Sequence, residues 1–144
     1  MSEPDPFQLQ RFVEAQESAF ETALGELRAG EKRMHWMWFV FPQLAGLGRS
    51  PTARYYAIRS LTEARAYLAH PLLGPRYREA VKALGAWAGE KHAEAILGGI
   101  DAMKLRSSLT LFEAASGDGL FAETLQAFFE GPDPATLQLL QRRD

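Results

Sequence analysis

The sequence of 144 residues contains no cysteine. Disulfide bonds, thiol nucleophiles and cysteine-ligated metals are therefore excluded. Long apolar runs are also absent, because the longest, residues 34–41, is interrupted by His35 and is far shorter than the roughly 20 residues of a membrane helix. The first residues, MSEPDPFQ, are acidic and polar, whereas a secretory signal is cationic and then apolar. We therefore expect a cytoplasmic protein that makes no contact with a membrane.

Net charge is also low, at −2, but the basic residues are unevenly distributed. Residues 31–60 contain Glu31 as their single acidic residue, against five basic ones: Lys32, Arg33, Arg49, Arg54 and Arg59. A local excess of this kind favours a compact site for a small anion over extended nucleic-acid binding, which needs a broad basic surface. Solvated surface charges are the alternative interpretation.

The overall composition is that of an ordinary globular protein, with 47% hydrophobic and 24% charged residues. A chain of this length can bury most of its surface in one core and has little room for a second domain. We expect one domain over residues 1–144, with residues 1–5 and 142–144 as flexible ends.

Helical spacing of apolar residues dominates the chain. Several boundaries carry recognisable signals: Asp5 with Pro6, Ser60 with Glu63, His70 with Pro71, and Asp133 with Pro134. Ser18 and Glu21 form a further capping box, which leaves open whether residues 15–17 are a kink or a full break. We predict an all-α fold, a single compact globular domain of about six to eight helices.

The stretch KRMHWMWFVFPQLAGLGRS, residues 32–50, is the one place where a strand competes with a helix. Its middle is rich in β-forming residues, but no other segment offers a matching strand partner. We therefore predict a short central helix from about residue 32, ended by Pro42. On such a helix Lys32, His35, Trp36 and Phe39 share one side.

Several blocks of the sequence resemble a known bacterial family. They are FVEAQ at 12–16, KRMHWMWFVFPQLAGLGRS at 32–50, YAI at 56–58, EARAYLAHPLLGPR at 63–76 and DAMKLRSSLTLF at 101–112. They are similar to the domain-of-unknown-function family eighteen-ten, some members of which are called calpastatin-like. The resemblance covers roughly residues 5–129 and implies a small helical domain, but it brings no activity or site residues with it.

Three side chains are candidates for catalysis. His35 lies among apolar neighbours, where an imidazole can act as a general acid or base, although a core histidine satisfied by a carbonyl is the more frequent case. Lys104 and Ser108 share one helical face with Ser107, so a desolvated lysine could activate a serine or bind an anion. Close helix packing is the more frequent explanation of two adjacent serines inside a helix.

Ten further residues are candidates for ligand binding: Lys32, Trp36, Trp38, Gln43, Gly46, Gly48, Arg49, Ser50, Tyr56 and Ser107. The tryptophans could stack on a flat ring, or fill the core. The amide of Gln43 could bind a ligand edge, or cap a helix. The backbone of the glycine-containing segment, with Arg49, could hold a phosphate or carboxylate, or form a turn before a serine N-cap.

Two classes of function follow from these candidates. The first is a pocket that binds, and could act on, a small anionic molecule with a planar group, such as a nucleotide or an ADP-ribose derivative. The second is a non-enzymatic interaction domain or homodimer that uses an exposed patch of tryptophan and phenylalanine. No pair of histidines has metal-ligand spacing, and we expect neither a metal nor a resident cofactor.

Overall fold

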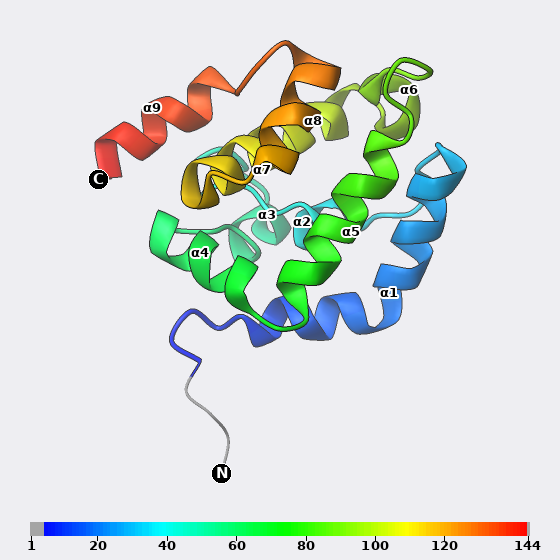
Figure 1. Ribbon diagram of the computed structural model, residues 1–144. Helices are drawn as coiled ribbons and strands as arrows, with labels where there is room; N and C mark the ends of the chain where they lie inside the picture. The colour runs from blue at the N-terminus through cyan, green and yellow to red at the C-terminus, as the bar shows by residue number, and fades with distance from the viewer. Residues whose placement is uncertain (1–4, 144) are drawn as a thin grey trace.

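Nine helices follow one another along residues 5–143, the part of the chain that the computed structural model describes (Figure 1). They are α1 (Gln10–Ala29), α2 (Met37–Val40), α3 (Pro51–Tyr55), α4 (Leu61–Ala69), α5 (Leu73–Gly85), α6 (Ala93–Leu97), α7 (Gly99–Ser116), α8 (Gly119–Phe129) and α9 (Pro134–Arg143). No strand occurs in this range, and a single parallel β-bridge joins Leu44 to Ile58. The all-α prediction is confirmed, with one helix more than the six to eight expected.

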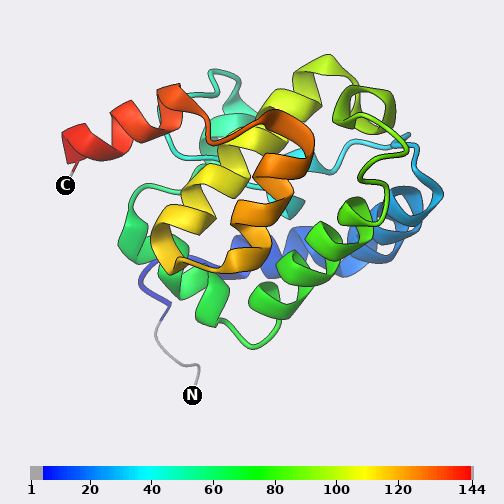
Figure 2. The same cartoon turned by 45° about the horizontal axis from the view of Figure 1, so that its top comes forward.

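Helix α7 lies at the centre of the molecule. It packs against α2, α4, α6, α8 and α9, and Figure 2 shows α8 running alongside it. All residues from 107 to 112 are buried, so every side of this part of the helix faces protein. Serine and threonine side chains in this run are small, which lets the neighbouring helices approach closely. The central element is therefore α7, and the prediction that residues 32–41 form it is wrong.

Helix α1 is continuous over its 20 residues, and it bends about halfway along its length (Figure 1). The capping box of Ser18 and Glu21 does not start a second helix, because the buried stripe from Phe12 to Leu27 continues through it. At the start, the carboxylate of Asp5 accepts hydrogen bonds from the backbone N–H groups of Leu9 (2.8 Å) and Gln10 (3.0 Å). The helix accordingly begins later than residue 6.

Residues 31–36 are not helical, which corrects the prediction of a helix from residue 32. The cause lies on α1, where one carboxylate oxygen of Glu26 accepts three hydrogen bonds. Its donors are the backbone N–H of Arg33 (2.8 Å), the backbone N–H of Met34 (3.1 Å) and the indole of Trp36 (2.8 Å). The backbone N–H of Lys32 donates to the carbonyl of Ile96 at 2.8 Å. These contacts hold the segment in an irregular conformation, and α2 begins only at Met37.

Other helix ends follow the local signals in the sequence. Ser60 accepts a hydrogen bond from the backbone N–H of Glu63 (3.0 Å) at the start of α4, and Asp133 accepts one from Thr136 (3.0 Å) at the start of α9. The His70-Pro71 step ends α4 as predicted. The flexibility of residues 1–5 and 142–144 stays a prediction; in the described part, the Asp5 carboxylate accepts the N–H of Leu9, and residues 142–143 belong to α9. Residues 1–4 and 144 lie outside the described part.

The β-bridge closes a loop that carries α3. The backbone N–H of Ala45 donates to the carbonyl of Ile58 (2.7 Å), and the N–H of Ile58 donates to the carbonyl of Gln43 (2.8 Å). Leu44 and Ile58 are both fully buried. The bridge between Leu44 and Ile58 therefore fixes the two ends of the segment 46–57 next to each other at the core.

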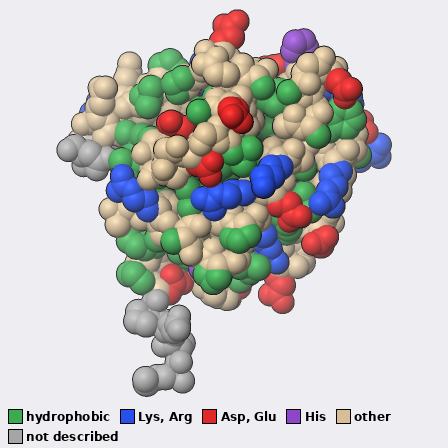
Figure 3. Space-filling view, viewed as in Figure 1, with side chains coloured by type: hydrophobic (Ala, Val, Ile, Leu, Met, Phe, Trp, Pro, Cys, Tyr) green, Lys and Arg blue, Asp and Glu red, His purple; other side chains and the backbone are tan. Residues whose placement is uncertain are grey.

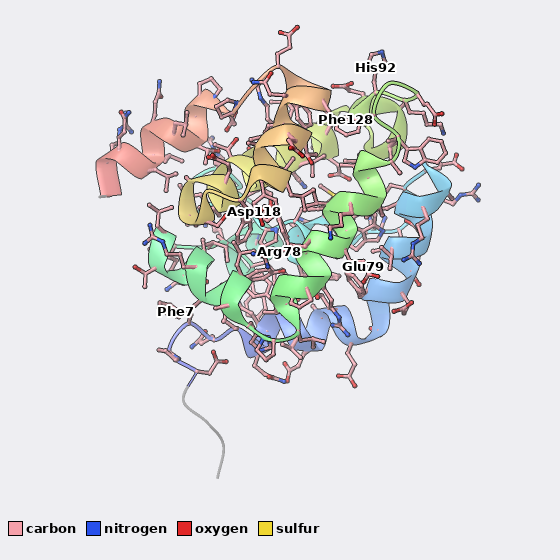
Figure 4. All side chains as sticks on the ribbon, in the orientation of Figure 1. Phe7, Arg78, Glu79, His92, Asp118 and Phe128 are labelled. Carbon is pink, nitrogen blue, oxygen red and sulfur yellow. The ribbon has the colours of Figure 1, made fainter. Side chains whose placement is uncertain are left out.

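The surface carries charges of both signs. On the face shown in Figure 3, Lys and Arg side chains form a band with Asp and Glu side chains close to it on both sides. One pair on this face joins Arg78 of α5 to Asp118, the N-cap of α8, at 3.1 Å (Figure 4). Within residues 5–143, no helix combines the length and hydropathy needed to cross a membrane.

Candidate functional site

Two adjoining hollows lie where the loop after α2 meets α7. The first, which we call the α7 groove, has a volume of about 290 Å³ and is lined by Gln43, Leu47, Gly48, Ile100, Met103, Lys104, Ser107, Asp133 and Ala135. The second, the inner cavity, is lined by Met37, Trp38, Phe41, Gln43, Leu44, Gly48, Ala53, Tyr56, Ala57 and Lys104. Its volume of about 10 Å³ has room for about one water molecule. Gln43, Gly48 and Lys104 line both, so they form the boundary between the two.

Lys104 reaches across this boundary to an aromatic ring. Its Nζ lies 5.1 Å from the centroid of a ring of Trp38, within the range of a cation–π interaction. The ring of His35 lies beside the same tryptophan in a tilted orientation, with 6.5 Å between centroids. His35 itself is exposed, while the Lys104 side chain is 24% exposed. The predicted pair of His35 and Lys104 is thus connected through the Trp38 side chain, which both residues contact.

Asp101 divides its carboxylate between two lysines. Its Oδ2 lies 3.0 Å from Nζ of Lys32, and its Oδ1 lies 3.6 Å from Nζ of Lys104. The Lys32 side chain is 9% exposed and also lies over Trp36, with 5.3 Å from Nζ to the ring centroid. The ion pair of Asp101 with Lys32 is shorter and more buried than its ion pair with Lys104, so Asp101 pairs mainly with Lys32. Lys104 is the less tightly held of the two cations.

The loop that lines the α7 groove needs a glycine at position 48 to pack against α3. A Cβ on Gly48 would lie 2.5 Å from Cβ of Ala53, so only glycine lets the loop approach α3 this closely. Ser50 is the N-cap of α3 and accepts a hydrogen bond from the backbone N–H of Ala53 at 3.1 Å. Its hydroxyl oxygen therefore serves the helix, as the N-cap interpretation expected.

A polar cluster closes the far end of the groove. Asp133 accepts hydrogen bonds from the Thr136 hydroxyl (2.6 Å) and from the Ser107 hydroxyl (3.3 Å), in addition to its capping bond. The Ser107 hydroxyl also donates to the carbonyl of Met103 at 3.1 Å. Ser107 and Asp133 are therefore fixed in place beside the groove.

The phenol of Tyr56 lies in the wall of the inner cavity. Burial raises its pKa, and the neighbouring Tyr55 raises it further, so the hydroxyl stays protonated at neutral pH. It packs against the rings of Phe12 and Phe39, at 5.8 and 5.4 Å between centroids. The phenol contributes a neutral group to this cavity.

Six predicted site residues thus line the two hollows: Trp38, Gln43, Gly48, Tyr56, Lys104 and Ser107. Lys32 and His35 lie next to them through Asp101 and Trp38. Gly46, Arg49 and Ser50 belong to the loop but line neither hollow, and both Gly46 and Arg49 are exposed.

Two predicted site residues belong to the core instead. Ser108 is fully buried, with its Oγ 2.8 Å from the hydroxyl of Tyr77 on α5, so it does not reach the groove. Trp36 is 1% exposed and donates its indole N–H to Glu26. The alternative of an exposed patch of tryptophan and phenylalanine therefore does not include Trp36. The exposed large apolar residues near the groove are Ile100 and Met103, which the sequence reasoning missed together with Asp101 and Asp133.

Among residues 5–143, no three His, Asp or Glu side chains are grouped so as to hold a metal ion. His92 lies at the edge of the molecule at the start of α6 (Figure 4). The ring of His70 accepts a hydrogen bond from the backbone N–H of Leu72 at 3.1 Å.

Comparison with known proteins extends the resemblance seen in the sequence. The family described as protein of unknown function (DUF1810) matches residues 6–140. The crystal structure of the conserved hypothetical protein Rv1873 from Mycobacterium tuberculosis is 48% identical and has a TM-score of 0.92, over 95% of this chain and 99% of that chain. No curated protein matches the sequence. Because the family match extends over nearly the whole sequence, this chain belongs to the DUF1810 family.

Proposed function

We propose that this protein binds a small anionic ligand with a planar group, such as a nucleotide or an ADP-ribose derivative, in the α7 groove. The observation that carries the proposal is the position of Lys104, which lines the groove and the inner cavity together with Gln43 and Gly48. A partly buried ammonium next to an amide and a close loop backbone is suited to a phosphate or carboxylate group.

The pairing of Lys104 supports this role. Asp101 lies 3.6 Å from Lys104 but 3.0 Å from Lys32, so a ligand anion would not have to break a short ion pair. Lys32 neutralises Asp101, which reduces repulsion between that carboxylate and an incoming anion.

The planar group has one region that can accommodate it. The inner cavity, at about 10 Å³, is too small for a ring. The apolar lip of the groove is formed by Leu47, Ile100 and Met103, and the last two side chains are 76% and 71% exposed. Methionine adapts its shape to flat ligands, and Asp133 offers an acceptor for a hydroxyl or amino group. The ring would lie on this lip while the anion contacts Lys104.

Calorimetric titration with AMP, ADP-ribose and uncharged adenosine tests the proposal. We expect Lys104→Gln to weaken binding of the two phosphorylated ligands by about tenfold or more, the size of a lost charge-assisted hydrogen bond. The melting temperature should stay near that of the wild type, because Lys104 is only partly buried and its ion pair with Asp101 is long, at 3.6 Å. Lys82→Gln, which removes an exposed lysine of α5 outside the groove, is the matched control and should leave affinity unchanged.

The exposure of Ile100 and Met103 favours one alternative, a homodimer that covers the groove. Equal nucleotide affinity in wild type and Lys104→Gln would contradict ligand binding at Lys104. A dimer in light scattering that Ile100→Glu dissociates would support the interaction role in its place.

A further inference from the structure

We infer that the ligand of the α7 groove is a ribonucleotide, and that Asp133 and Ser107 select its ribose by accepting hydrogen bonds from the two neighbouring hydroxyl groups of the sugar. The inference rests on the proposed function, because it names the sugar of a ligand whose anion contacts Lys104. Asp133 and Ser107 both line the groove, together with Lys104 and Met103. A deoxyribonucleotide lacks one of the two hydroxyl groups, so the groove would distinguish the two classes of nucleotide.

The carboxylate of Asp133 has one engaged oxygen and one unpaired oxygen. Its Oδ2 accepts hydrogen bonds from the backbone N–H of Thr136 (3.0 Å), the hydroxyl of Thr136 (2.6 Å) and the hydroxyl of Ser107 (3.3 Å). Within residues 5–143, no group donates a hydrogen bond to its Oδ1. The backbone N–H of Asp133 donates to the hydroxyl of Thr110 at 2.8 Å, which fixes the residue from a further side. A fixed carboxylate oxygen without a donor inside the protein is suited to accept a strong hydrogen bond from a ligand hydroxyl.

Ser107 provides a second acceptor next to the first. Its one hydroxyl proton is directed to the carbonyl of Met103 (3.1 Å) or to Asp133, and the oxygen keeps a lone pair with which it can accept a hydrogen bond. The Oγ of Ser107 lies 3.3 Å from Oδ2 of Asp133, so the two residues present their acceptors side by side. The 2′- and 3′-hydroxyl groups of ribose are also immediate neighbours, so each can donate to one of these acceptors. An acidic side chain that binds a ribose hydroxyl is a recurrent solution in nucleotide-binding proteins.

The position of Lys104 determines the direction in which the nucleotide lies. Residues three apart on a helix, such as Lys104 and Ser107, have their Cβ atoms about 5 to 6 Å from each other. The phosphate and the hydroxyl groups of a 5′-phosphorylated ribose are separated by a comparable length. A phosphate at Lys104 therefore places the hydroxyl groups at Ser107 and Asp133. The reverse orientation would bring the phosphate next to the carboxylate of Asp133, and repulsion between the two negative charges opposes it.

Calorimetric titration with AMP, 2′-deoxy-AMP and 3′-deoxy-AMP tests the inference. We expect the wild type to bind AMP about tenfold more tightly than the deoxynucleotide that lacks the hydroxyl bound to Asp133, the size of a lost hydrogen bond to a charged group. The other deoxynucleotide should bind severalfold more weakly than AMP, because it lacks the hydroxyl bound to Ser107.

Two variants assign these preferences to their residues. Asp133→Asn keeps the helix cap, because the amide oxygen can accept from Thr136, but it turns the amide NH₂ towards the position of Oδ1, where it cannot accept. The larger of the two affinity ratios between AMP and a deoxynucleotide should therefore fall to about one. Ser107→Ala should abolish the smaller ratio, and alanine is well tolerated inside a helix. The ratios are informative where single affinities are not, because removal of a negative charge alters the affinity for all three anions alike.

Two further variants separate this inference from the proposed function. Glu123→Gln removes an exposed carboxylate of α8 outside the groove and should leave both ratios unchanged. Lys104→Gln should weaken all three nucleotides to the same extent and also keep the ratios. Equal affinity of the wild type for the three nucleotides, with all of them weakened by Lys104→Gln, would overturn the ribose inference alone. Ratios that persist in Asp133→Asn and Ser107→Ala would likewise overturn it, whereas no binding of any nucleotide would overturn the proposed function as well.

Discussion

At the scale of single residues, Glu26 has the largest effect on the shape of the candidate site. Its carboxylate accepts the backbone N–H groups of Arg33 and Met34 and the indole N–H of Trp36, which holds residues 33–36 in an irregular conformation. The indole of Trp36 is thereby drawn into the core, while Trp38 is left at the inner cavity. One acidic residue on α1 therefore decides which of the two tryptophans is available to a ligand.

The pKa of Glu26 leads to a pH-dependent prediction. Burial raises this pKa, but the hydrogen bonds from Arg33, Trp36 and Met34 and the charge of Lys32 outweigh burial and lower it below its ordinary value. A lowered pKa in the folded state stabilises the protein above the pKa of the unfolded chain, and this contribution disappears as pH falls through the folded-state pKa. We expect Glu26→Gln to lower the free energy of unfolding by about 1 kcal/mol at pH 7 and by less at pH 3.

Urea unfolding followed by tryptophan fluorescence at the two pH values measures this difference. Glu17→Gln, at an exposed position of the same helix, is the control and should behave like the wild type at both. A destabilisation by Glu26→Gln that is as large at pH 3 as at pH 7 would show that the charge of Glu26 is not involved.

At the scale of elements, the junction of α4 and α5 depends on close backbone contact. Gly74 is buried in the first turn of α5, and a Cβ there would overlap the carbonyl oxygen of Leu68 on α4. The Leu68 carbonyl belongs to the backbone of α4, so it cannot move aside as a flexible side chain could. The spacing of the two helices, and with it the packing of α4 on α7, requires glycine at this position.

We therefore predict that Gly74→Ala lowers the free energy of unfolding by about 1 to 3 kcal/mol, the usual range for overpacking. Gly25→Ala is the matched control, because Gly25 lies inside α1 with nothing within 4 Å of its added Cβ. Its alanine variant should gain about 0.5 to 1 kcal/mol from better helix propensity. Thermal and urea denaturation of both variants would decide, and equal stabilities would contradict the packing argument.

The sequence predicts those elements whose boundaries are set locally. The Ser60 cap, the His70-Pro71 step and the Asp133 cap each depend on residues within one turn of the helix end, and all three occur in the structure. Residues 31–36 were mispredicted because their conformation depends on Glu26, which lies on a neighbouring helix. Helical propensity cannot include such a tertiary contact.

The same distinction applies to the candidate site. Six of the predicted residues line the two hollows, and Lys104, Gln43 and Gly48 line both. Their role in binding stays a prediction. The sequence does not predict that the Ser108 side chain points into the core, because this orientation depends on its hydrogen bond with the hydroxyl of Tyr77 on α5. Asp133 was recognised only as a cap, because its second contact, to Ser107, comes from tertiary packing.

At the scale of the whole molecule, one aromatic cluster connects three of the helices, α4, α5 and α7. Phe112 of α7 is fully buried, and its ring centroid lies 4.5 Å from that of Tyr77 and 5.2 Å from that of Tyr67. Burial raises the pKa of both tyrosines, so their hydroxyls stay neutral. Helices α4, α5 and α7 therefore share a single core.

We expect Phe112→Ala to lower the free energy of unfolding by about 3 to 5 kcal/mol. Because the core is shared, far-ultraviolet circular dichroism and tryptophan fluorescence should report the same transition in wild type and variant. Leu137→Ala, at a position of α9 that is 38% exposed, should have a much smaller effect. Two separate transitions in the wild type would show that the helices do not unfold as one unit.

The β-bridge between Leu44 and Ile58 has a consequence for how this protein can change. It holds both ends of the segment 46–57 through main-chain atoms, so the residue types inside the segment are not needed to close it. Loops whose ends are fixed in this way tolerate insertions and replacements. A replacement of residues 46–55 by a segment of another length would alter one wall of the α7 groove while the rest of the fold is retained. Ligand preference can in this way evolve, or be engineered, independently of stability.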